Sequence, residues 1–484
     1  MGGSSVLTLA ELLADLQPAL RVEGAERVPV GEVCIDSRQA GPDCLFVALR
    51  GENTDGHLYV RDAFDAGAVV ALVERPVAGA ASIDTVRGTA PRTLTVPVAV
   101  VVGDSLAALQ RLAQARRLAR PGLRVIGITG SIGKTTTKEA VAAALSQRYA
   151  TLRSAGNYNS EIGLPLTLMN LQAQHERAVL EMGMYDLGEI ALLCRIARPQ
   201  VGVVTNVGPA HLERLGTIER IAQAKAELVE ALPSDGVAVL NGDDARVRAM
   251  GQRTDARVIT FGLGCGNSVW ADDISSCGLE GVRFQAHLAQ EAFVGIEPRS
   301  RSLKLATLGR HTVHAGLAAV AVALLEGLTW EEVEQGLLAQ GYGLRLVPKR
   351  GMRGATLLDD TYNASPASVG AALDVLAELP GRRVAALGDM RELGSYEARA
   401  HREVGRRCAQ VVDVLVTVGR GGRLIAEAAL EAGLALSAVH AVADNRAAVE
   451  VLSALLREGD GVLVKGSRSM AMGAIVSALE EEEA

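Results

Sequence analysis

The stretch LRVIGITGSIGKTTTKEAVAAALSQRY, from Leu123 to Tyr149, decides the fold of the middle of the chain. It opens with Leu123 to Thr129, a short apolar run rich in β-branched residues. After a glycine-rich turn, Val141, Ala144 and Leu145 recur at the spacing of one helix face. This order predicts a buried strand, a loop and a helix.

The loop of this stretch has the composition of a phosphate-binding loop. Glycines let the backbone approach an anion, a Lys suits the β- and γ-phosphates, and a hydroxyl suits Mg²⁺. Ile128 stands where the usual pattern has its first glycine, so the loop is a variant, G-x-x-G-K-[ST]. A plain strand-to-helix turn is the alternative interpretation. The residues predicted to bind ATP here are Gly130, Ser131, Ile132, Gly133, Lys134, Thr135 and Thr136.

The composition excludes several classes of protein. A net charge of −7 without basic runs, and only 3% aromatic residues, argue against a nucleic-acid partner. Scattered cysteines without a C-x-x-C pair predict buried reduced thiols and a cytoplasmic location. The N-terminus lacks the basic region of a signal peptide, and the longest apolar run, Ala315 to Leu325, is too short to span a bilayer.

The order of apolar and polar runs predicts an α/β protein. At 484 residues the chain is too long for one core and should form about three domains. We expect a small α/β domain over residues 1–115 and a central P-loop ATPase-like domain with a parallel sheet over residues 116–342. Residues 343–484 alternate strands and helices in the manner of a Rossmann-like domain.

Polar residues follow the predicted central strands at the point where each strand ends. Glu181 ends one strand, Asn206, a candidate to bind ATP, follows the next, and His211 lies five residues further on. Ligands of parallel sheets gather at the carboxyl ends of the strands. The sequence therefore predicts one Mg²⁺ held by Thr135 and Glu181, and a second held by His211 together with a carbamate on Lys225.

Lys225 conflicts with its surroundings in the sequence. It lies on the apolar face of the predicted helix Thr217 to Leu232, in line with Ile218 and Ile221. A lysine aimed into a core is costly unless it is paired or neutralised. It could extend its amine to the edge of the apolar stripe, or it could lie beside a metal, pair with a phosphate, or carry a carbamate that binds the metal.

Two polar clusters in the first domain, Asp36-Ser37-Arg38 and Arg50 to His57, are open to two interpretations. Turn chemistry alone would explain their Asp, Ser, Asn and Gly residues. A ligand-binding role would use Ser37, Arg38, Arg50 and His57.

Taken together, the polar clusters of all three domains resemble the Mur ligases. DDTYNASP and GDMRELG favour the members that join D-alanyl-D-alanine to a UDP-N-acetylmuramoyl-tripeptide. The segments that carry the resemblance are GITGSIGKTTTKE, GNYNSEIGLPLTLM, LEMGMYDLGEI, TNVGPAHLERLG, AKAELVEAL, LLDDTYNASPAS, ALGDMRELG and VKGSRSM.

The resemblance implies an ATP-dependent amide ligase of peptidoglycan precursor synthesis that forms an acyl phosphate, with a UDP-recognising first domain. It implies that Asp360 binds the ribose and Arg345 the γ-phosphate. Asn157 and Asn159 should bind substrate, and Asp389, Glu392, Lys465 and Arg468 should face the dipeptide or help to close the site. The candidate catalytic residues are thus Lys134, Lys225, His211 and Arg345, with ATP and Mg²⁺ as cofactors.

One segment departs from the family pattern. Where the family has G-x-H-N-x-x-N, with the second Asn near adenine, this chain has Thr312 and Ala315 at the two Asn positions. Adenine should therefore be recognised differently. Two other functions stay open, a Mur-type ligase that adds a single amino acid and a P-loop protein that uses ATP as a switch. We expect a monomer that acts on small molecules.

Overall fold

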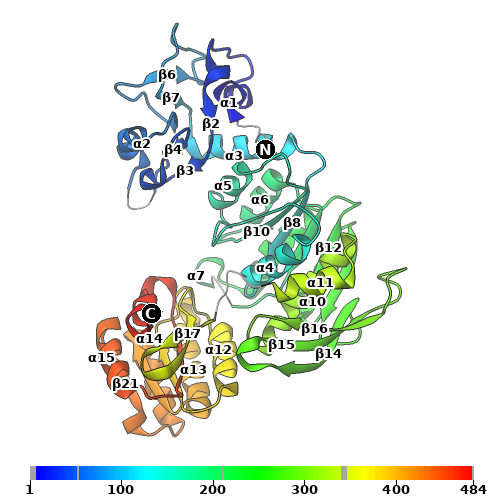
Figure 1. Ribbon diagram of the computed structural model, residues 1–484, viewed down its shortest axis with the longest axis vertical. Coiled ribbons are helices and arrows are strands. Elements are labelled where there is room, and N and C mark those ends of the chain that lie inside the picture. Colours follow the sequence, from blue (N-terminus) through cyan, green and yellow to red (C-terminus); the bar gives the residue numbers. More distant parts are fainter. Residues whose placement is uncertain (1–6, 52–53, 210–211, 340–345, 482–484) are drawn as a thin grey trace.

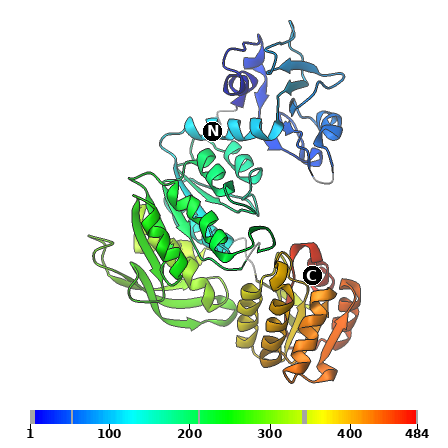
Figure 2. The same cartoon turned by 180° about the vertical axis from the view of Figure 1, so that it is seen from behind.

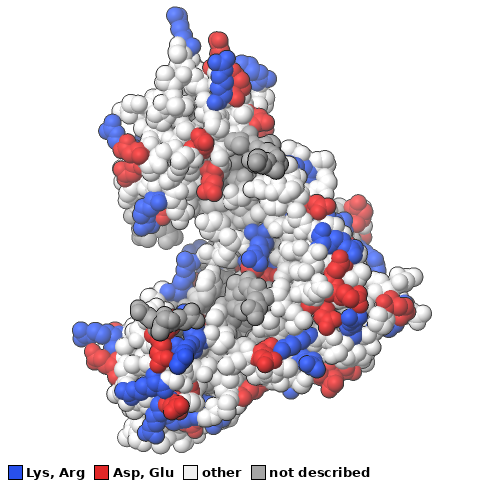
Figure 3. All heavy atoms as spheres, viewed as in Figure 1, with Lys and Arg blue, Asp and Glu red and all other residues white. Residues whose placement is uncertain are grey.

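The computed structural model describes residues 7–51, 54–209, 212–339 and 346–481. Three α/β domains follow one another along the chain (Figure 1), and the view from behind shows the same separation (Figure 2). The space-filling view has a deep indentation between the first and third domains, with Lys and Arg side chains on both walls (Figure 3).

The N-terminal domain contains a parallel sheet of five strands in the order β3-β4-β5-β7-β6 and a two-stranded antiparallel ribbon, β1-β2. Helix α1 buries Leu9, Leu12, Leu13 and Leu16, the i, i+3, i+4, i+7 positions of one face. The elements are β1 Leu7–Thr8, α1 Leu9–Leu16, β2 Pro29–Val30, β3 Val33–Cys34, β4 Leu45–Val47, α2 Val60–Asp65, β5 Val70–Val73, β6 Ala81–Asp84, β7 Val98–Val101 and α3 Ser105–Leu118.

Helix α3 joins the first two domains. Its apolar residues belong to one cluster that runs from the core of the N-terminal domain into the central domain. On its polar side, Gln110 Nε2 donates to the Glu161 carbonyl (3.0 Å), Gln114 Nε2 to the Arg195 carbonyl (3.0 Å), and buried Arg117 Nε to a third carbonyl (2.9 Å). The boundary expected after residue 115 falls inside this helix, so the two domains share α3.

The central domain is built on a sheet of nine strands in the order β16-β15-β14-β13-β12-β11-β8-β10-β9. Strands β8 to β13 pair in parallel, and β14 to β16 extend the sheet as an antiparallel edge. The elements are β8 Arg124–Thr129, α4 Lys134–Leu145, β9 Thr151–Arg153, α5 Gly163–Met169, β10 Arg177–Glu181, α6 Glu189–Ala197, β11 Val201–Val204, α7 Leu212–Leu215, α8 Ile218–Glu230, β12 Val237–Asn241, α9 Ala245–Ala249, β13 Arg257–Gly262, β14 Val269–Ser276, β15 Val282–Leu288, β16 Ser300–Leu305, α10 Val313–Leu325 and α11 Trp330–Leu338.

Helices cover both faces of the central sheet. Helices α4, α10 and α11 pack on one face, and α5, α6 and α8 pack on the other. Both faces of the strands are therefore apolar, as in doubly covered parallel sheets.

The C-terminal domain has six strands in the order β17-β18-β22-β19-β20-β21, of which only β17 is antiparallel to its neighbour. Helices lie on both sides of it, so the Rossmann-like prediction is confirmed. The elements are β17 Val347–Gly351, β18 Ala355–Asp360, α12 Pro366–Glu378, β19 Arg383–Leu387, α13 Glu397–Val411, β20 Val414–Val418, α14 Gly419–Glu431, β21 Val439–Val442, α15 Asn445–Leu455, β22 Gly461–Lys465 and α16 Gly473–Leu479.

All six cysteines are free thiols, as predicted, but they are not all buried. Cys34, Cys44, Cys194 and Cys408 are buried, whereas Cys265 is exposed and Cys277 is half-buried. None of the helices in the described ranges combines the length and apolarity that crossing a bilayer requires.

A buried carboxylate at the end of α10 ties the helix to the central sheet. Glu326 Oε1 accepts from Arg124 Nε (2.5 Å) and Glu326 Oε2 from Arg177 Nε (2.8 Å). The side chain of Glu326 is 2% exposed. Because both guanidinium groups would lose their partner, we expect Glu326→Ala to destabilise the central domain by about 2 to 4 kcal/mol.

Unfolding in urea followed by tryptophan fluorescence measures this loss, because both tryptophans of the chain, Trp270 and Trp330, lie in the central domain. Glu334→Ala is the matched control. It breaks a more exposed pair with Arg301 (3.0 Å), and such pairs contribute about 0 to 1 kcal/mol. Equal effects of the two substitutions would contradict the role assigned to Glu326.

Candidate active site

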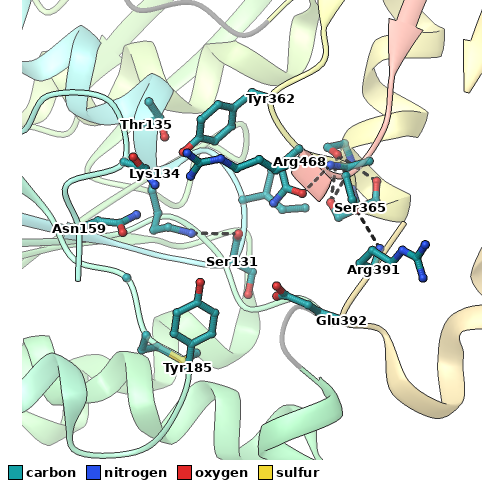
Figure 4. Close-up of a pocket in the computed structure, with 18 of the residues that line it drawn as sticks. Ser131, Lys134, Thr135, Asn159, Tyr185, Tyr362, Ser365, Arg391, Glu392 and Arg468 are labelled. Carbon is teal, nitrogen blue, oxygen red and sulfur yellow. Dashed lines mark hydrogen bonds between the residues drawn. The ribbon is translucent and has the colours of Figure 1, made fainter. Parts of the chain in front are cut away.

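A cavity of about 500 Å³ lies between the central and C-terminal domains. Figure 4 shows Lys134, Thr135, Asn159 and Tyr185 on one side of it. The opposite side carries side chains of the C-terminal domain. The labelled residues of the C-terminal domain are Tyr362, Ser365, Arg391, Glu392 and Arg468.

The loop between β8 and α4 is held by its neighbours at the ends of the strands. Gly130 has φ +151°, and a Cβ at this position would meet Thr205 Oγ1 at 1.8 Å, so the residue must be glycine. Asn206 Oδ1 accepts from the Ile132 amide (3.0 Å) and Asn206 Nδ2 donates to the Ile132 carbonyl (2.8 Å). Asn206, predicted to bind ATP, thus contacts the loop backbone and does not line the cavity.

Ser131 to Thr135 line the cavity, whereas Gly130 and Thr136 do not. Lys134 Nζ donates to the carbonyls of Gly130 (2.8 Å) and Ser131 (3.2 Å). The ammonium therefore lies over the loop itself, where the phosphates of a nucleotide would bind.

Glu181, at the end of β10, joins three segments of the site. Its Oε2 accepts from Thr135 Oγ1 (2.9 Å) and its Oε1 from Asn159 Nδ2 (2.8 Å). The residue is 2% exposed and borders the cavity. A carboxylate and a hydroxyl side by side next to a phosphate loop fit Mg²⁺, which prefers oxygen ligands and completes its shell with water and phosphate oxygens.

Two other predicted site residues lie outside the described residues. They are His211, predicted to bind a metal ion, and Arg345, predicted to bind the γ-phosphate. Within the described ranges, no group of three or more His, Cys, Asp or Glu side chains is arranged to hold a metal ion. Glu181 and Thr135 would therefore hold Mg²⁺ mainly in combination with substrate and water oxygens.

Lys225 of α8 is buried and borders the cavity. Within the described part of the chain, its amine forms no hydrogen bond and no ion pair. Burial, and in second place the positive charge of Lys134, hold the pKa of Lys225 well below its ordinary value. The site therefore favours the neutral form of this amine more than water does for an exposed lysine.

The C-terminal domain contributes charged and hydroxyl groups to the cavity. The loop after β19 places Arg391 and Glu392 there, and the loop after β22 places Ser467 and Arg468 there. Ser467 Oγ accepts from the Arg391 amide (2.8 Å), so the two loops fix each other. Glu392 and Arg468, which were predicted to face the dipeptide or to help close the site, therefore both line the cavity.

Two predicted substrate-binding residues lie in the interior instead. Asp389 is 1% exposed, and its Oδ1 accepts from the Gly422 amide in the first turn of α14 (3.0 Å). Lys465 is 1% exposed and donates to Asp360 Oδ2 (2.5 Å) and to the Asn363 carbonyl (2.9 Å). Neither residue lines the cavity, because the cores around β19 and β22 enclose their side chains. Asp360, predicted to bind ATP, is likewise enclosed in its pair with Lys465.

The substrate candidates of the N-terminal domain do not reach this cavity. Arg38 pairs with Asp36 (2.6 Å) and Arg50 with Glu74 (2.7 Å). The side chain of His57 is only 2% exposed, with Nδ1 2.6 Å from Asp55 Oδ1 and Nε2 accepting from the Glu74 amide (2.9 Å). His57 therefore supports the fold of this domain, while Ser37, Arg38 and Arg50 keep accessible surface.

The segment that departs from the family pattern has no side-chain amide at positions 312 and 315. Thr312 is buried, its hydroxyl donates to the Gly309 carbonyl (2.7 Å), and Ala315 is buried as well. His311 borders a second cavity of about 340 Å³, together with Arg310 and residues of α12. Burial lowers the pKa of His311 to about 4, so its imidazole is neutral at physiological pH.

Sequence reasoning missed several residues of the cavity. Tyr362, Asn363, Arg391 and Ser467 belong to clusters that the sequence does mark after strands, but strand-end position alone does not tell which members face outward. Tyr185 and Glu189 follow β10 in the same way. The lining residues that were not singled out are Ser160, Gly183, Met184, Tyr185, Glu189, Pro209, Tyr362, Asn363, Ala364, Ser365, Ser368, Arg391, Leu393, Ser467 and Ser469.

Family models match all three domains. The Mur ligase middle domain matches residues 128–323, the Mur ligase, glutamate ligase domain matches 344–468, and the Mur ligase family, catalytic domain matches 29–117. UDP-N-acetylmuramoyl-tripeptide--D-alanyl-D-alanine ligase of Synechocystis sp. is 37% identical over 95% of this chain and 94% of its own length. The chain belongs to the Mur ligase family.

Solved structures of Mur ligases have the same fold. MurF from Acinetobacter baumannii superposes with a TM-score of 0.82 at 31% identity, covering 98% of each chain. MurF ligase from Thermotoga maritima, in complex with ADP, superposes with a TM-score of 0.74 at 27% identity, covering 92% of this chain and 96% of its own. The three-domain α/β prediction is confirmed.

Lys134 should dominate the binding of triphosphate at this Mur ligase site. We expect Lys134→Ala to weaken the binding of an ATP analogue by about 2 kcal/mol or more, as for the loss of one preorganised charge contact. Isothermal titration measures the Kd of both forms. Lys304→Ala, which removes an ammonium from a surface pair with Glu280 (2.7 Å), is the control and should bind as the parent does. Equal affinity of the Lys134 variant would remove the phosphate-loop assignment.

Proposed function

We propose that this chain is an ATP-dependent ligase that joins D-alanyl-D-alanine to a UDP-N-acetylmuramoyl-tripeptide during peptidoglycan precursor synthesis. One observation carries the proposal. A phosphate loop, a carboxylate and a buried lysine of the central domain face two arginines of the C-terminal domain across a single cavity. The relatives that match nearly the full length of the chain bear the name of this activity.

The arrangement suits the chemistry of amide formation. A carboxylate is a poor electrophile, so ATP first transfers its γ-phosphoryl group to a carboxylate oxygen of the tripeptide. The amine of D-alanyl-D-alanine then attacks the acyl phosphate, the new C–N bond forms, and inorganic phosphate leaves. The first step brings several negative charges together, and cations preorganised around the cavity reduce its barrier.

The two sides of the cavity would have different roles. The central domain would bind ATP and the acceptor, and the C-terminal domain would bind the dipeptide. Lys134 and the amides of the phosphate loop would hold the triphosphate, and Asn157 and Asn159 would bind the acceptor close to Glu181. Arg391 and Arg468 would meet the developing negative charge or the dipeptide carboxylate, and Glu392 the dipeptide amine. Asp389 and Lys465 support these loops from the interior.

The N-terminal domain would hold the UDP end of the acceptor. Ser37, Arg38 and Arg50 keep accessible surface on this domain. The indentation between the first and third domains has basic side chains on both walls, which suits a substrate with a diphosphate (Figure 3). We further propose a monomer that works in the cytoplasm.

Mg²⁺ would bind at Thr135 and Glu181. Bound there, it would supply Lewis-acid stabilisation of phosphate oxygens. Asn159 keeps the Glu181 carboxylate oriented from the other side.

Measuring ADP release tests the function. With ATP and UDP-N-acetylmuramoyl-tripeptide we expect rapid ADP release only when D-alanyl-D-alanine is present. Turnover with a single amino acid and UDP-muramoyl peptide would support a different Mur-type ligase. ADP release at the same rate without UDP-N-acetylmuramoyl-tripeptide and D-alanyl-D-alanine would indicate a protein that uses ATP as a switch. That result would overturn the proposal.

Lys225 should act as a carbamate. The neutral amine would attack CO₂, form an N–C bond and lose one proton, which places an anionic oxygen ligand where a bare ammonium would be unfavourable. We expect Lys225→Ala to lose about 100-fold or more of its turnover. Formate or acetate should restore part of it by supplying the missing carboxylate.

Because the reaction needs the neutral amine, the carbamate should increase as the pH rises through the lowered pKa of Lys225 and should disappear in CO₂-free acidic buffer. Carbon-13 NMR with labelled bicarbonate detects it directly. Lys134→Ala is the control, because it keeps Lys225. Formate or acetate should not restore the turnover of this variant. Absence of both rescue and labelled signal would leave Lys225 with an electrostatic role only.

A further inference from the structure

A second buried lysine of the central domain has no place in the chemistry above. Lys138 lies on α4, one turn beyond Lys134 and Thr135, and is 0% exposed. It does not line the cavity. A buried ammonium is costly unless its donors are satisfied, so its partners indicate what it is for.

The partners of Lys138 lie on the segment that follows β9. Its Nζ donates to the Ser154 carbonyl (2.7 Å) and reaches the Gly156 carbonyl (3.5 Å). It is also 2.9 Å from Glu139 Oε1, and Glu139 pairs with Arg153 at 2.7 Å. The ammonium therefore fastens the chain at residues 153–156 to the helix that starts at the phosphate loop.

The same segment then enters the cavity. Residues 155–158 are exposed, and Asn157, Asn159 and Ser160 line the cavity. An exposed segment that contains a glycine needs fixed points to present side chains in one geometry. Lys138 supplies the first fixed point.

Glu181 supplies the second fixed point. It accepts from Asn159 Nδ2 (2.8 Å), and its own amide donates to Ser154 Oγ (3.2 Å). It also accepts from Thr135 Oγ1 (2.9 Å). Helix α4 thus holds the segment in two places, through Thr135 and Glu181 at its first turn and through Lys138 one turn later.

We propose that Lys138 is a positioning residue that couples nucleotide binding at the phosphate loop to acceptor binding on residues 154–160. A nucleotide that orders the first turn of α4 orders Lys138, and Lys138 orders the segment that carries Asn157 and Asn159. The acceptor then binds more tightly once ATP is bound. The identity of this acceptor, a UDP-linked muramoyl peptide, rests on the proposed function.

Lys138→Met tests the coupling, because it removes the ammonium and keeps an unbranched side chain. The Kd of UDP-N-acetylmuramoyl-tripeptide is measured with and without a non-hydrolysable ATP analogue. We expect the analogue to tighten acceptor binding about tenfold in the parent protein and less than about twofold in Lys138→Met. The Kd of the analogue alone should change little.

Two further variants separate positioning from general stability. Lys304→Met, in an exposed pair of the same domain, should keep the full coupling. In a double-mutant cycle with Asn159→Ala, the effects on acceptor affinity should not add, because both substitutions act on one segment. Unchanged coupling in Lys138→Met, additive effects, or a parent protein without coupling would each overturn the proposal.

A measurement on the parent protein covers the case in which Lys138→Met does not fold. Hydrogen exchange of the amides of residues 154–160 should slow when the ATP analogue alone binds. Unchanged exchange there would overturn the coupling. Hydrogen exchange needs no turnover, so it tests the coupling independently of the ADP-release assay. A negative ADP-release assay would contradict the proposed function but not the coupling.

Discussion

The parallel pairing of β8 between β10 and β11 is the constraint on which the site depends. In this register Ile128 stands opposite Glu181, and Thr129 stands opposite Val204. Three strands therefore end together, and the loop after β8 has the Glu181 carboxylate on one side and the Thr205 hydroxyl on the other. The close approach of Thr205 requires glycine at position 130. The shared carboxyl edge of β8, β10 and β11 therefore determines three features of the site. These are the glycine in the loop, the position of Glu181 and the start of α4.

Features that depend on local pattern could be predicted from the sequence. The strand-loop-helix around Gly130, the carboxylate at the end of β10 and the conflict at Lys225 each follow from residues close together in the chain. Asp389 follows β19 and Lys465 is the last residue of β22, yet both side chains point inward. Their burial is set by Gly422 of α14 and by Asp360 of β18, which lie far away in the sequence. Strand-end position gives the edge of the sheet but not the direction of each side chain.

Polar residues that link distant segments were hardest to predict. Gln110, Gln114 and Arg117 give α3 the appearance of a helix with one solvated face. That face instead donates to backbone carbonyls of the next domain. Lys138 is similar, since a lysine in the first turns of a helix usually faces water. In both cases the acceptors are main-chain carbonyls, which have no side-chain signature in the sequence.

Lys138, Lys225 and Lys465 are buried. They differ in whether hydrogen bonds and ion pairs compensate for the loss of water around the amine. Lys138 is satisfied by two carbonyls and Glu139. Lys465 is satisfied by Asp360 and the Asn363 carbonyl. A satisfied ammonium is a fixed cross-link, because moving it would leave its partners unpaired. Lys225 forms no such bond within the described ranges and borders the cavity, so its amine alone can change its chemical state without breaking the fold. The two paired lysines thus act as fixed cross-links, whereas the amine of Lys225 can take part in the proposed carbamate chemistry.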